Sequence, residues 1–329
     1  MTLRRLRAGL IGLGAMGRNH ARVLANLDGV DLVGVVDPAG DQRRAHSAPV
    51  LSTVEELIAL GADYAVVACP TTLHEEISLK LADANICALI EKPLAGSVDA
   101  AKRLVDAFES RGLVAGVGHI ERFNPALMSL RARLEAGELG EVYQIVTRRQ
   151  GPFPNRIADV GVINDLAPHD IDLTSWLTGQ EYVSVAAHTA SKSGRPHEDM
   201  VVVVGQLADS TVVNHLVNWL TPFKERTMVI TGQRGCFVVD TLTADLTYFA
   251  NGEQDTEWEA LHSFRGVTEG DIVRYSIPKR EPLLVEHEMF RDAVYGKPAE
   301  IVSLAQGLRT VRVSAAVIES ARYGVTVKL

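Results

Sequence analysis

The chain has 329 residues, of which 47% are hydrophobic and 22% are charged. This composition is typical of globular proteins, and the length is sufficient for two domains that each bury their own core. The formal net charge of -8 argues against a nucleic-acid partner, because phosphate backbones are bound by basic surfaces. Cys69, Cys87 and Cys236 lie far apart in the sequence, which predicts neither a disulfide framework nor a zinc site, and we expect no metal.

The N-terminus has a superficial likeness to a twin-arginine export signal, because Arg4 and Arg5 precede an apolar stretch. That stretch is short and holds glycines that are expected to bind a cofactor, so cleavage there would destroy the site. The sequence has no run of about eighteen apolar residues, which a membrane-spanning helix requires. We therefore expect a cytoplasmic protein without a membrane partner.

A glycine-rich motif, Gly12-Leu-Gly-Ala-Met-Gly17, follows an apolar run at 8–11 and opens an amphipathic segment at 18–27. This is the layout of a dinucleotide-binding strand–helix unit. Gly12 would make the tight turn, Gly14 would let the backbone approach a pyrophosphate, and Gly17 would let the helix pack closely on the strand. Free N–H groups at the helix N-terminus would then face the phosphates.

An acidic residue, Asp37, ends the next apolar run at 32–36. A carboxylate at this place accepts hydrogen bonds from the adenosine ribose and repels a 2′-phosphate, so it favours NAD over NADP. Arg43 and Arg44 follow closely. We interpret them as the solvated face of the next helix, and NADP remains open.

Short apolar runs alternate with helical patterns over the first 120 or so residues. This alternation predicts a parallel sheet with helices on both faces. Thr53 followed by Glu56 predicts a capping box. The expected strands are 8–11, 32–36, 64–69, 88–91 and 114–117, and the expected helices are 18–27, 54–60, 75–84 and 99–110.

Polar segments follow the third, fourth and fifth of these strands, at 68–74, 91–93 and 118–125. Ligands of parallel sheets bind beyond the strand C-termini, so Lys92 is expected near the nicotinamide, with a plain surface lysine as the alternative. The expected cofactor-binding residues are Gly12, Gly14, Ala15, Met16, Gly17, Asp37, Cys69, Pro70, Thr72, His74, Glu91, Lys92 and His119.

A second pattern of chemical groups lies on a predicted helix after a loop at 151–156, where Asp165, His169, Asp172 and Trp176 would share one face. A lone histidine on such a helix is usually a satisfied core residue. An aspartate one turn before it favours a general base instead, because a carboxylate fixes the imidazole tautomer and raises its basicity.

Strand patterns dominate the remaining chain before two final helices. Within 213–220 the side chains of His215, Val217 and Trp219 alternate with those of a more polar face. This mixture predicts a sheet with one side on helices and the other facing a site or a subunit partner. The expected elements are a helix at 124–136, strands at 141–149, 201–207, 211–220, 226–232, 236–241 and 246–249, and helices at 282–294 and 304–322.

Taken together, these motifs resemble the glucose-fructose oxidoreductase/inositol dehydrogenase (Gfo/Idh/MocA) family of sugar dehydrogenases over essentially the whole chain. The resemblance implies an α/β Rossmann domain with a parallel sheet at 1–121. An α+β domain with an open, mainly antiparallel sheet would follow at 122–329, for substrate binding and assembly into a homodimer or homotetramer. The matching pieces are Gly12–Gly17, Glu91-Lys92-Pro93, Arg122-Phe-Asn-Pro125, Asp165 with His169 and Asp172, the helix from Pro282, and the segment from Gly307.

The resemblance also implies catalytic roles. Lys92 would orient and polarise the reacting hydroxyl, and His169, supported by Asp165, would be the general base. This is chemically coherent, since a hydroxyl that loses a hydride must also lose its proton, and a cation stabilises alkoxide character as it develops.

Within the family, segments 117–125, 151–162 and 218–226 look most like the UDP-N-acetylglucosamine 3-dehydrogenases. Asp159-Val-Gly161 stands where the family commonly has three glycines, which also fits the nucleotide-sugar group. Guanidinium groups suit diphosphates, and Lys224 and Arg226 could contribute, although each could also be a surface ion pair. The expected substrate-binding residues are Lys92, Arg122, Asn124, Arg156, Asp165 and His169.

Three functions remain open from the sequence. The first is an NAD-dependent dehydrogenase for the 3-hydroxyl of a UDP-linked N-acetyl amino sugar. The second is an inositol or aldose dehydrogenase, or a 3-ketosugar reductase, of the same family. The third is a non-catalytic NAD-binding sensor, against which the presence of both Lys92 and His169 argues.

Overall fold

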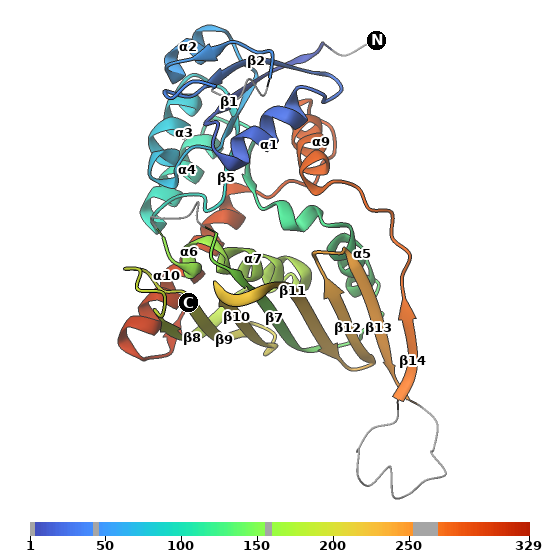
Figure 1. Ribbon diagram of the computed structural model, residues 1–329. Helices are drawn as coiled ribbons and strands as arrows, with labels where there is room; N and C mark the ends of the chain where they lie inside the picture. Colours follow the sequence, from blue (N-terminus) through green and yellow to red (C-terminus); the bar gives the residue numbers. More distant parts are fainter. Residues whose placement is uncertain (1–3, 42–45, 155–159, 253–268) are drawn as a thin grey trace, which may run out of the picture. The chain divides into compact units, whose positions relative to one another are not determined.

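The computed structural model describes residues 4–41, 46–154, 160–252 and 269–329. The chain divides into two compact units (Figure 1). The first unit comprises Met1–Ile120 and Glu281–Arg312, and the second comprises Glu121–Arg280 and Val313–Leu329. The sequence placed all of 122–329 in one second domain, so the assignment of Glu281–Arg312 to the first unit differs from that expectation.

The first unit is built on a six-stranded parallel sheet with the order β3-β2-β1-β4-β5-β6. The strand order reverses between β1 and β4, which is where such sheets bind ligands. The Rossmann prediction is confirmed, and the sequence missed only β3, whose two residues are too few to show a period. The strands are β1 (Leu6–Ile11), β2 (Val30–Val36), β3 (Val50–Leu51), β4 (Tyr64–Val67), β5 (Cys87–Glu91) and β6 (Ala115–Gly118).

The start of α2 (Val54–Ala59) is fixed by side-chain caps. At α2 the Thr53 hydroxyl accepts a hydrogen bond from the Glu56 N–H at 3.3 Å, and the Glu56 carboxylate accepts one from the Ser52 N–H at 2.8 Å. The predicted capping box is therefore present, with the return bond one residue earlier than in the usual pattern. The helices are α1 (Ala15–Leu24), α2 (Val54–Ala59), α3 (His74–Asp83), α4 (Val98–Glu109) and α9 (Pro282–Val294).

The segment Glu281–Arg312 belongs to the first unit because it completes that unit's core. Phe290 of α9 is 1% exposed and packs edge-on against Tyr64 of β4, with 5.4 Å between the ring centroids. The N–H of Val117 in β6 donates to the carbonyl of Val302 at 2.9 Å. These long-range contacts bury apolar area that the earlier segment alone would leave in water.

The second unit is an open nine-stranded sheet with the order β14-β13-β12-β11-β7-β10-β9-β8-β15. Its neighbouring strands are antiparallel except for the pair β7–β10, so the predicted mainly antiparallel sheet is confirmed. The sequence missed β8, β14 and β15. The strands are β7 (Val142–Pro152), β8 (Tyr182–Ala190), β9 (Met200–Leu207), β10 (Val212–Asn218), β11 (Leu220–Gly232), β12 (Gly235–Asp240), β13 (Asp245–Asn251), β14 (Glu269–Arg274) and β15 (Val327–Lys328).

Helices cover one face of this sheet, as Figure 1 shows for α5 (Pro125–Glu135) and α7 (Ala167–Thr178). The alternation predicted along β10 is confirmed, since His215 and Val217 are fully buried on the helix-covered face. Buried Tyr182 and Thr147 hydroxyls lie 2.8 and 2.7 Å from the two ring nitrogens of His215. Burial and the nearby Arg149 charge lower the pKa of His215 to about 3, so this histidine is a satisfied core residue.

The last long helix, α10 (Leu304–Tyr323), contributes residues to both units. None of the helices in the described part of the chain is long and apolar enough to cross a membrane.

Candidate active site

In the loop between β1 and α1, a different steric environment surrounds each glycine of the motif. Gly12 has φ +97°, and a Cβ there would lie 2.7 Å from the Ala68 carbonyl oxygen. A Cβ at Gly17 would collide with the Gly12 carbonyl oxygen. A Cβ at Gly14 would meet no protein atom within 4 Å. Glycine at position 14 therefore leaves space for a bound group, which is the fit that a dinucleotide diphosphate requires.

The Asp37 carboxylate is fixed at the end of β2 by two backbone amides. One oxygen accepts a hydrogen bond from the Leu13 N–H at 2.7 Å, and the other accepts one from the Ala39 N–H at 2.9 Å. Each carboxylate oxygen can accept a second hydrogen bond. The acid thus braces the glycine loop and retains acceptor capacity for ribose hydroxyls.

Replacing Gly14 by valine is expected to weaken NAD⁺ binding about 100-fold, because two or three charge-assisted backbone bonds to the diphosphate would be lost. The open space around this position predicts an unchanged melting temperature without ligand. Gly17→Ala is the matched comparison, and we expect it to lower the melting temperature itself. Fluorescence titration with NAD⁺ and thermal unfolding measure the two effects, and Gly14→Val with native affinity would contradict the assignment.

The loops after β4 and β5 are joined by His74, which is 1% exposed. Its two ring nitrogens lie 3.1 Å from the Cys69 carbonyl oxygen and 3.0 Å from the Pro93 carbonyl oxygen. Burial lowers the pKa of His74. Burial raises the pKa of the Cys69 thiol to about 11, so this cysteine is not a nucleophile. His74 therefore shapes the two loops from inside the unit.

Glu91 is also an interior residue, 8% exposed, and its contact with the cofactor stays a prediction. Its carboxylate lies 2.9 Å from Nε2 of His20 and accepts a 3.1 Å hydrogen bond from the backbone N–H of Lys92. Burial alone would raise its pKa, but the His20 bond and the charges of His20 and Lys92 hold the pKa of Glu91 below its ordinary value. Glu91 thus links the His20 ring to the backbone of Lys92.

The remaining residues that we predict to bind the cofactor differ in their exposure to solvent. Ala15 and Met16 form the start of α1, where Ala15 is exposed. Pro70 and Thr72 are exposed at the end of β4. His119 follows β6 and is 2% exposed. For all of these residues the cofactor contact stays a prediction.

A second buried carboxyl group, that of Glu286 on α9, lies close enough to Glu91 to feel its charge. Glu286 is 2% exposed, and within the described residues neither of its carboxylate oxygens has a hydrogen-bond partner. Burial and the nearby Glu91 charge raise the pKa of Glu286 well above its ordinary 4.5. No pattern in the sequence pointed to this residue, because a glutamate on an amphipathic helix normally faces water.

Because the pKa of Glu286 is higher in the folded state than its ordinary 4.5, its contribution to stability is present below pH 4.5 and is lost as the pH rises toward its folded pKa. Glu286→Gln should therefore stabilise the protein at pH 8 relative to pH 5, by up to about 1.4 kcal/mol per pH unit. Thermal unfolding across this range measures the difference. Glu109→Gln, at an exposed position of α4, should show little pH dependence. A flat difference for Glu286→Gln would contradict the assignment.

In the second unit, Asp165 and His169 lie on two helices rather than on one. α6 (Val162–Asp165) ends at Leu166, and α7 begins at Ala167. The break has a local cause, since Pro168 has no N–H to donate and its ring would clash with the preceding turn. His169, Asp172 and Trp176 share α7 as predicted, but the predicted face does not extend to Asp165, which lies on α6. Asp165 is 8% exposed, and His169 lies in the first turn of α7.

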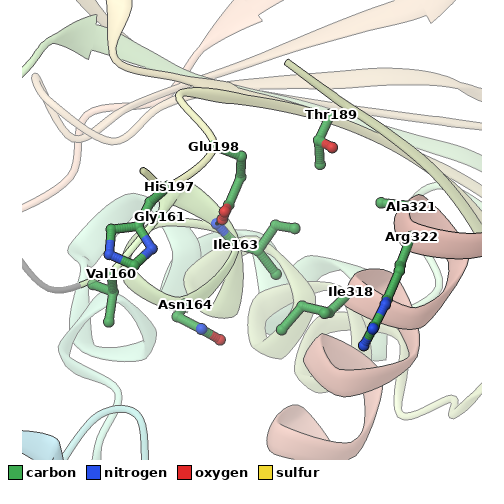
Figure 2. Close-up of a pocket in the computed structure, with 10 residues that line it drawn as sticks. All are labelled: Val160, Gly161, Ile163, Asn164, Thr189, His197, Glu198, Ile318, Ala321 and Arg322. Atoms are coloured by element: carbon green, nitrogen blue, oxygen red, sulfur yellow. Dashed lines mark hydrogen bonds between the residues drawn. The ribbon is translucent and has the colours of Figure 1, made fainter. Parts of the chain in front are cut away.

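The start of α6 is held by Glu198, a residue that sequence reasoning missed. Its carboxylate accepts a 3.0 Å hydrogen bond from the Ile163 N–H, and its backbone carbonyl accepts one from the Val162 N–H at 3.2 Å. A Cβ at Gly161 would collide with the Glu198 carboxylate. A cavity of about 340 Å³ lies beside this cap, with Asn164, His197 and Arg322 among its lining residues (Figure 2).

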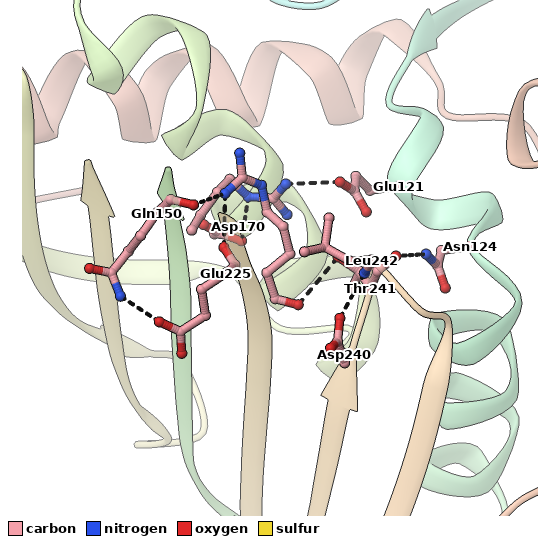
Figure 3. A network of polar contacts seen from close by, with 10 residues as sticks. Glu121, Asn124, Gln150, Asp170, Glu225, Asp240, Thr241 and Leu242 are labelled. Atoms are coloured by element: carbon pink, nitrogen blue, oxygen red, sulfur yellow. Dashed lines mark hydrogen bonds and ion pairs between the residues drawn. The ribbon is translucent and has the colours of Figure 1, made fainter. Parts of the chain in front are cut away.

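Two predicted substrate ligands have partners inside the second unit. The Arg122 guanidinium donates from Nε and Nη2 to the Asp172 carboxylate at 2.7 and 2.6 Å, and the two side chains are 7% and 2% exposed. Asn124 caps α5 by accepting a hydrogen bond from the Ala126 N–H. Its amide also donates to the Thr241 carbonyl at 2.9 Å (Figure 3). These side chains position α5 and α7, and substrate contact stays a prediction for both. Arg156 lies outside the described residues.

Asp170, the residue after His169, belongs to a buried ionic cluster with Arg149 and Glu121 (Figure 3). Arg149 donates to Glu121 at 2.8 Å and to Asp170 at 3.1 Å. Burial alone would lower the pKa of Arg149, but the two carboxylates outweigh it and raise that pKa. Arg226 uses Nη1 on the Gln150 and Glu225 carbonyls, and burial and the Arg149 charge lower its pKa. Lys224, the other cation on β11 that could contribute to diphosphate binding, is exposed.

Comparisons with known proteins identify the family. The family model "Oxidoreductase family, NAD-binding Rossmann fold" matches residues 6–119, and the model "GFO/IDH/MocA C-terminal domain" matches residues 127–238. The UDP-N-acetylglucosamine 3-dehydrogenase of Acidithiobacillus ferrooxidans is 30% identical over 293 residues, which cover 88% of each chain. This chain belongs to the GFO/IDH/MocA oxidoreductase family.

Two further relatives show the range of this family. The myo-inositol dehydrogenase Hyg17 of Streptomyces leeuwenhoekii is 38% identical over 192 residues, which span 56% of this chain and 59% of the relative. The crystal structure of GenD2 from gentamicin A biosynthesis, in complex with NAD, is 25% identical with a TM-score of 0.80 and covers 99% of this chain and 97% of that chain.

The full-length A. ferrooxidans relative also has a solved structure. The structure is named UDP-N-acetylglucosamine 3-dehydrogenase GnnA. It superposes with a TM-score of 0.83 at 29% identity and covers 96% of this chain and 97% of that chain. The chain is accordingly an oxidoreductase with an NAD-binding Rossmann domain.

Proposed function

We propose that this family member uses NAD⁺ to oxidise the 3-hydroxyl of a UDP-linked N-acetyl amino sugar. The observation that carries the proposal is the identity of 30% with a UDP-N-acetylglucosamine 3-dehydrogenase across 88% of both chains. The match to myo-inositol dehydrogenase is higher in identity but covers 56% of this chain. Similarity that extends through both domains supports a shared substrate class better than a partial match does.

NAD rather than NADP is supported by the acid at the end of β2. The Asp37 carboxylate is held in place by two backbone amides, and its negative charge would repel a 2′-phosphate. The glycine loop leaves space at Gly14 for a diphosphate. The GenD2 structure, which has a comparable fold, is a complex with NAD.

When bound, the nicotinamide ring would supply the chemistry of hydride acceptance. The chain's own residues have to manage the hydroxyl proton and the developing charge. The imidazole of His169 takes the proton as general base, and Asp165 supports its basicity. The Lys92 ammonium group orients the hydroxyl and stabilises the alkoxide character that arises as the C–H bond breaks.

A second candidate function is the oxidation of a free inositol or aldose, or the reverse reduction of a 3-ketosugar. The observation that favours it is the 38% identity with a myo-inositol dehydrogenase over 192 residues. Both candidates need the same acid–base residues, so only the substrate distinguishes them.

Incubation with NAD⁺ or NADP⁺ and a panel of UDP-sugars, inositols and aldoses tests the proposal through the absorbance of the reduced cofactor. A hydrazine trap for the ketone is needed, because the equilibrium favours the alcohol. We expect UDP-N-acetylglucosamine with NAD⁺ to give the highest kcat/KM. Turnover of myo-inositol without turnover of any UDP-sugar would establish the second candidate. Tight NAD⁺ binding without turnover of any substrate would indicate a sensor.

A further inference from the structure

A chain of three buried side chains runs through the first unit toward Lys92, and we call it the histidine chain: His287, His20 and Glu91. Nε2 of His287 lies 2.8 Å from Nδ1 of His20, and Nε2 of His20 lies 2.9 Å from the Glu91 carboxylate. The two imidazoles are both 0% exposed, and Glu91 is 8% exposed. The other Glu91 oxygen accepts the backbone N–H of Lys92 at 3.1 Å.

The members of the histidine chain come from three separate parts of the sequence. His20 lies on α1, Glu91 ends β5, and His287 lies on α9. The two imidazole rings meet edge-on, with 5.0 Å between their centroids. Segment Glu281–Arg312 therefore does more than complete the hydrophobic core, because it also supplies the far end of a polar chain that reaches the residue before Lys92.

The pKa values of the groups around Glu91 are shifted in different directions. Burial and the His20 charge lower the pKa of His287 well below its ordinary value, so His287 is neutral. Burial and the Glu91 charge raise the pKa of Glu286, so this neighbour is also neutral. His74 is the further titratable group that feels the Glu91 charge. Burial opposes ionisation of Glu91, but its hydrogen bond to His20 and the neighbouring charges hold the pKa of Glu91 below its ordinary value.

A buried carboxylate keeps its orientation only while donors hold both of its oxygens. His20 can donate from Nε2 to Glu91 in a fixed ring orientation because His287 occupies the space at Nδ1 and completes its bonding. Without a polar group at position 287, Nδ1 of His20 would lose that partner inside the protein. The ring would then turn, release Glu91, and loosen the backbone from which the Lys92 side chain extends.

We propose that His287 is a positioning residue for Lys92 and acts through His20 and Glu91. The proposal rests on the catalytic role proposed above for Lys92. It assigns a function to a helix that follows strands β7 to β14 in the sequence and contains none of the predicted site residues.

His287→Leu tests the proposal, with His287→Gln as the conservative variant whose amide retains a polar group near the position of Nε2. We expect His287→Leu to lower kcat about tenfold while KM for NAD⁺ stays within about twofold, because misplacing a reacting group affects chemistry before binding. His287→Gln should restore most of the kcat. Phe290→Leu, one turn along the buried face of α9, is the matched packing control and should lower only the melting temperature.

A second readout does not depend on turnover. Trace acetylation by acetic anhydride at several pH values, followed by mass spectrometry of the Lys92 peptide, reports the reactivity of the Lys92 amine in the NAD⁺-free protein. We expect the pH profile of Lys92 labelling to shift in His287→Leu and in Glu91→Gln, and to match the native profile in Phe290→Leu. Glu91→Gln provides the same test if His287→Leu is recovered only unfolded.

Native labelling and native kcat in His287→Leu would overturn the proposal, as would an equal labelling shift in Phe290→Leu. Failure of the proposed function is a separate outcome. In that case Lys92→Ala would retain full turnover, or no sugar would be oxidised. The labelling profile of Lys92 would still report whether His287 positions it.

Discussion

His169→Asn is expected to lower kcat by about 10²- to 10⁴-fold, the range that a positioned general base contributes. Asparagine has a similar size and can form hydrogen bonds, but it cannot accept a proton at neutral pH. Lys92→Met should cause a loss of comparable size, because it removes the cation proposed to stabilise the alkoxide. Steady-state kinetics with the best substrate of the panel measures both losses.

NAD⁺ affinity separates this interpretation from a general disturbance of the protein. His169 lies in the first turn of a helix of the second unit, whereas the predicted cofactor loop belongs to the first unit. We therefore expect the dissociation constant for NAD⁺ and the melting temperature of His169→Asn to remain close to the native values. A variant with native kcat would remove His169 from the mechanism.

Asp172→Ala is expected to destabilise the second unit by about 3–5 kcal/mol, the usual cost of leaving a buried charge without its partner. Arg122 is 7% exposed and donates two hydrogen bonds to the Asp172 carboxylate, so its guanidinium would remain buried beside an apolar methyl group. Urea unfolding followed by tryptophan fluorescence reports the change, because Trp176 lies on the same helix.

The double variant Arg122→Met with Asp172→Leu is the matched control. Replacing a buried ion pair by apolar side chains of similar volume is often neutral, so the double variant should recover most of the lost stability. Equal destabilisation in the double variant would mean that Asp172 acts through other contacts than the ion pair.

Local patterns in the sequence were sufficient for the Rossmann domain. The spacing of the glycines at 12–17 was enough to predict the loop, although the steric limit on Gly12 is set by Ala68, which follows β4. The alternation of buried strands and amphipathic helices gave all strands of the parallel sheet except the two-residue β3. The strand patterns after residue 200 predicted β9 to β13, because alternation of buried and exposed side chains is visible over five or more residues.

Sequence reasoning was weaker wherever one residue's role depends on a distant partner. Asp165 and His169 show a limit over a short distance as well, since the helical period ignored the break at Pro168 that separates α6 from α7. Glu91 shows it across the fold, because nothing in the sequence indicates that His20 lies beside its carboxylate. Arg122 is a further example, since its bond to Asp172 joins residues far apart in the sequence, and ligand contact stays a prediction for both residues.

Short motifs in the sequence were enough to identify the cofactor domain, the family and the residue types available for acid–base chemistry, because strand and helix geometry fixes their spacing. The three-dimensional contacts were needed to learn which polar side chains have partners within the protein, such as Glu91, Arg122 and Glu198, and that His287 completes a chain leading to Lys92. The physical reason is that burial and partnership depend on contacts between segments far apart in the chain, and these contacts leave no period or spacing in the sequence.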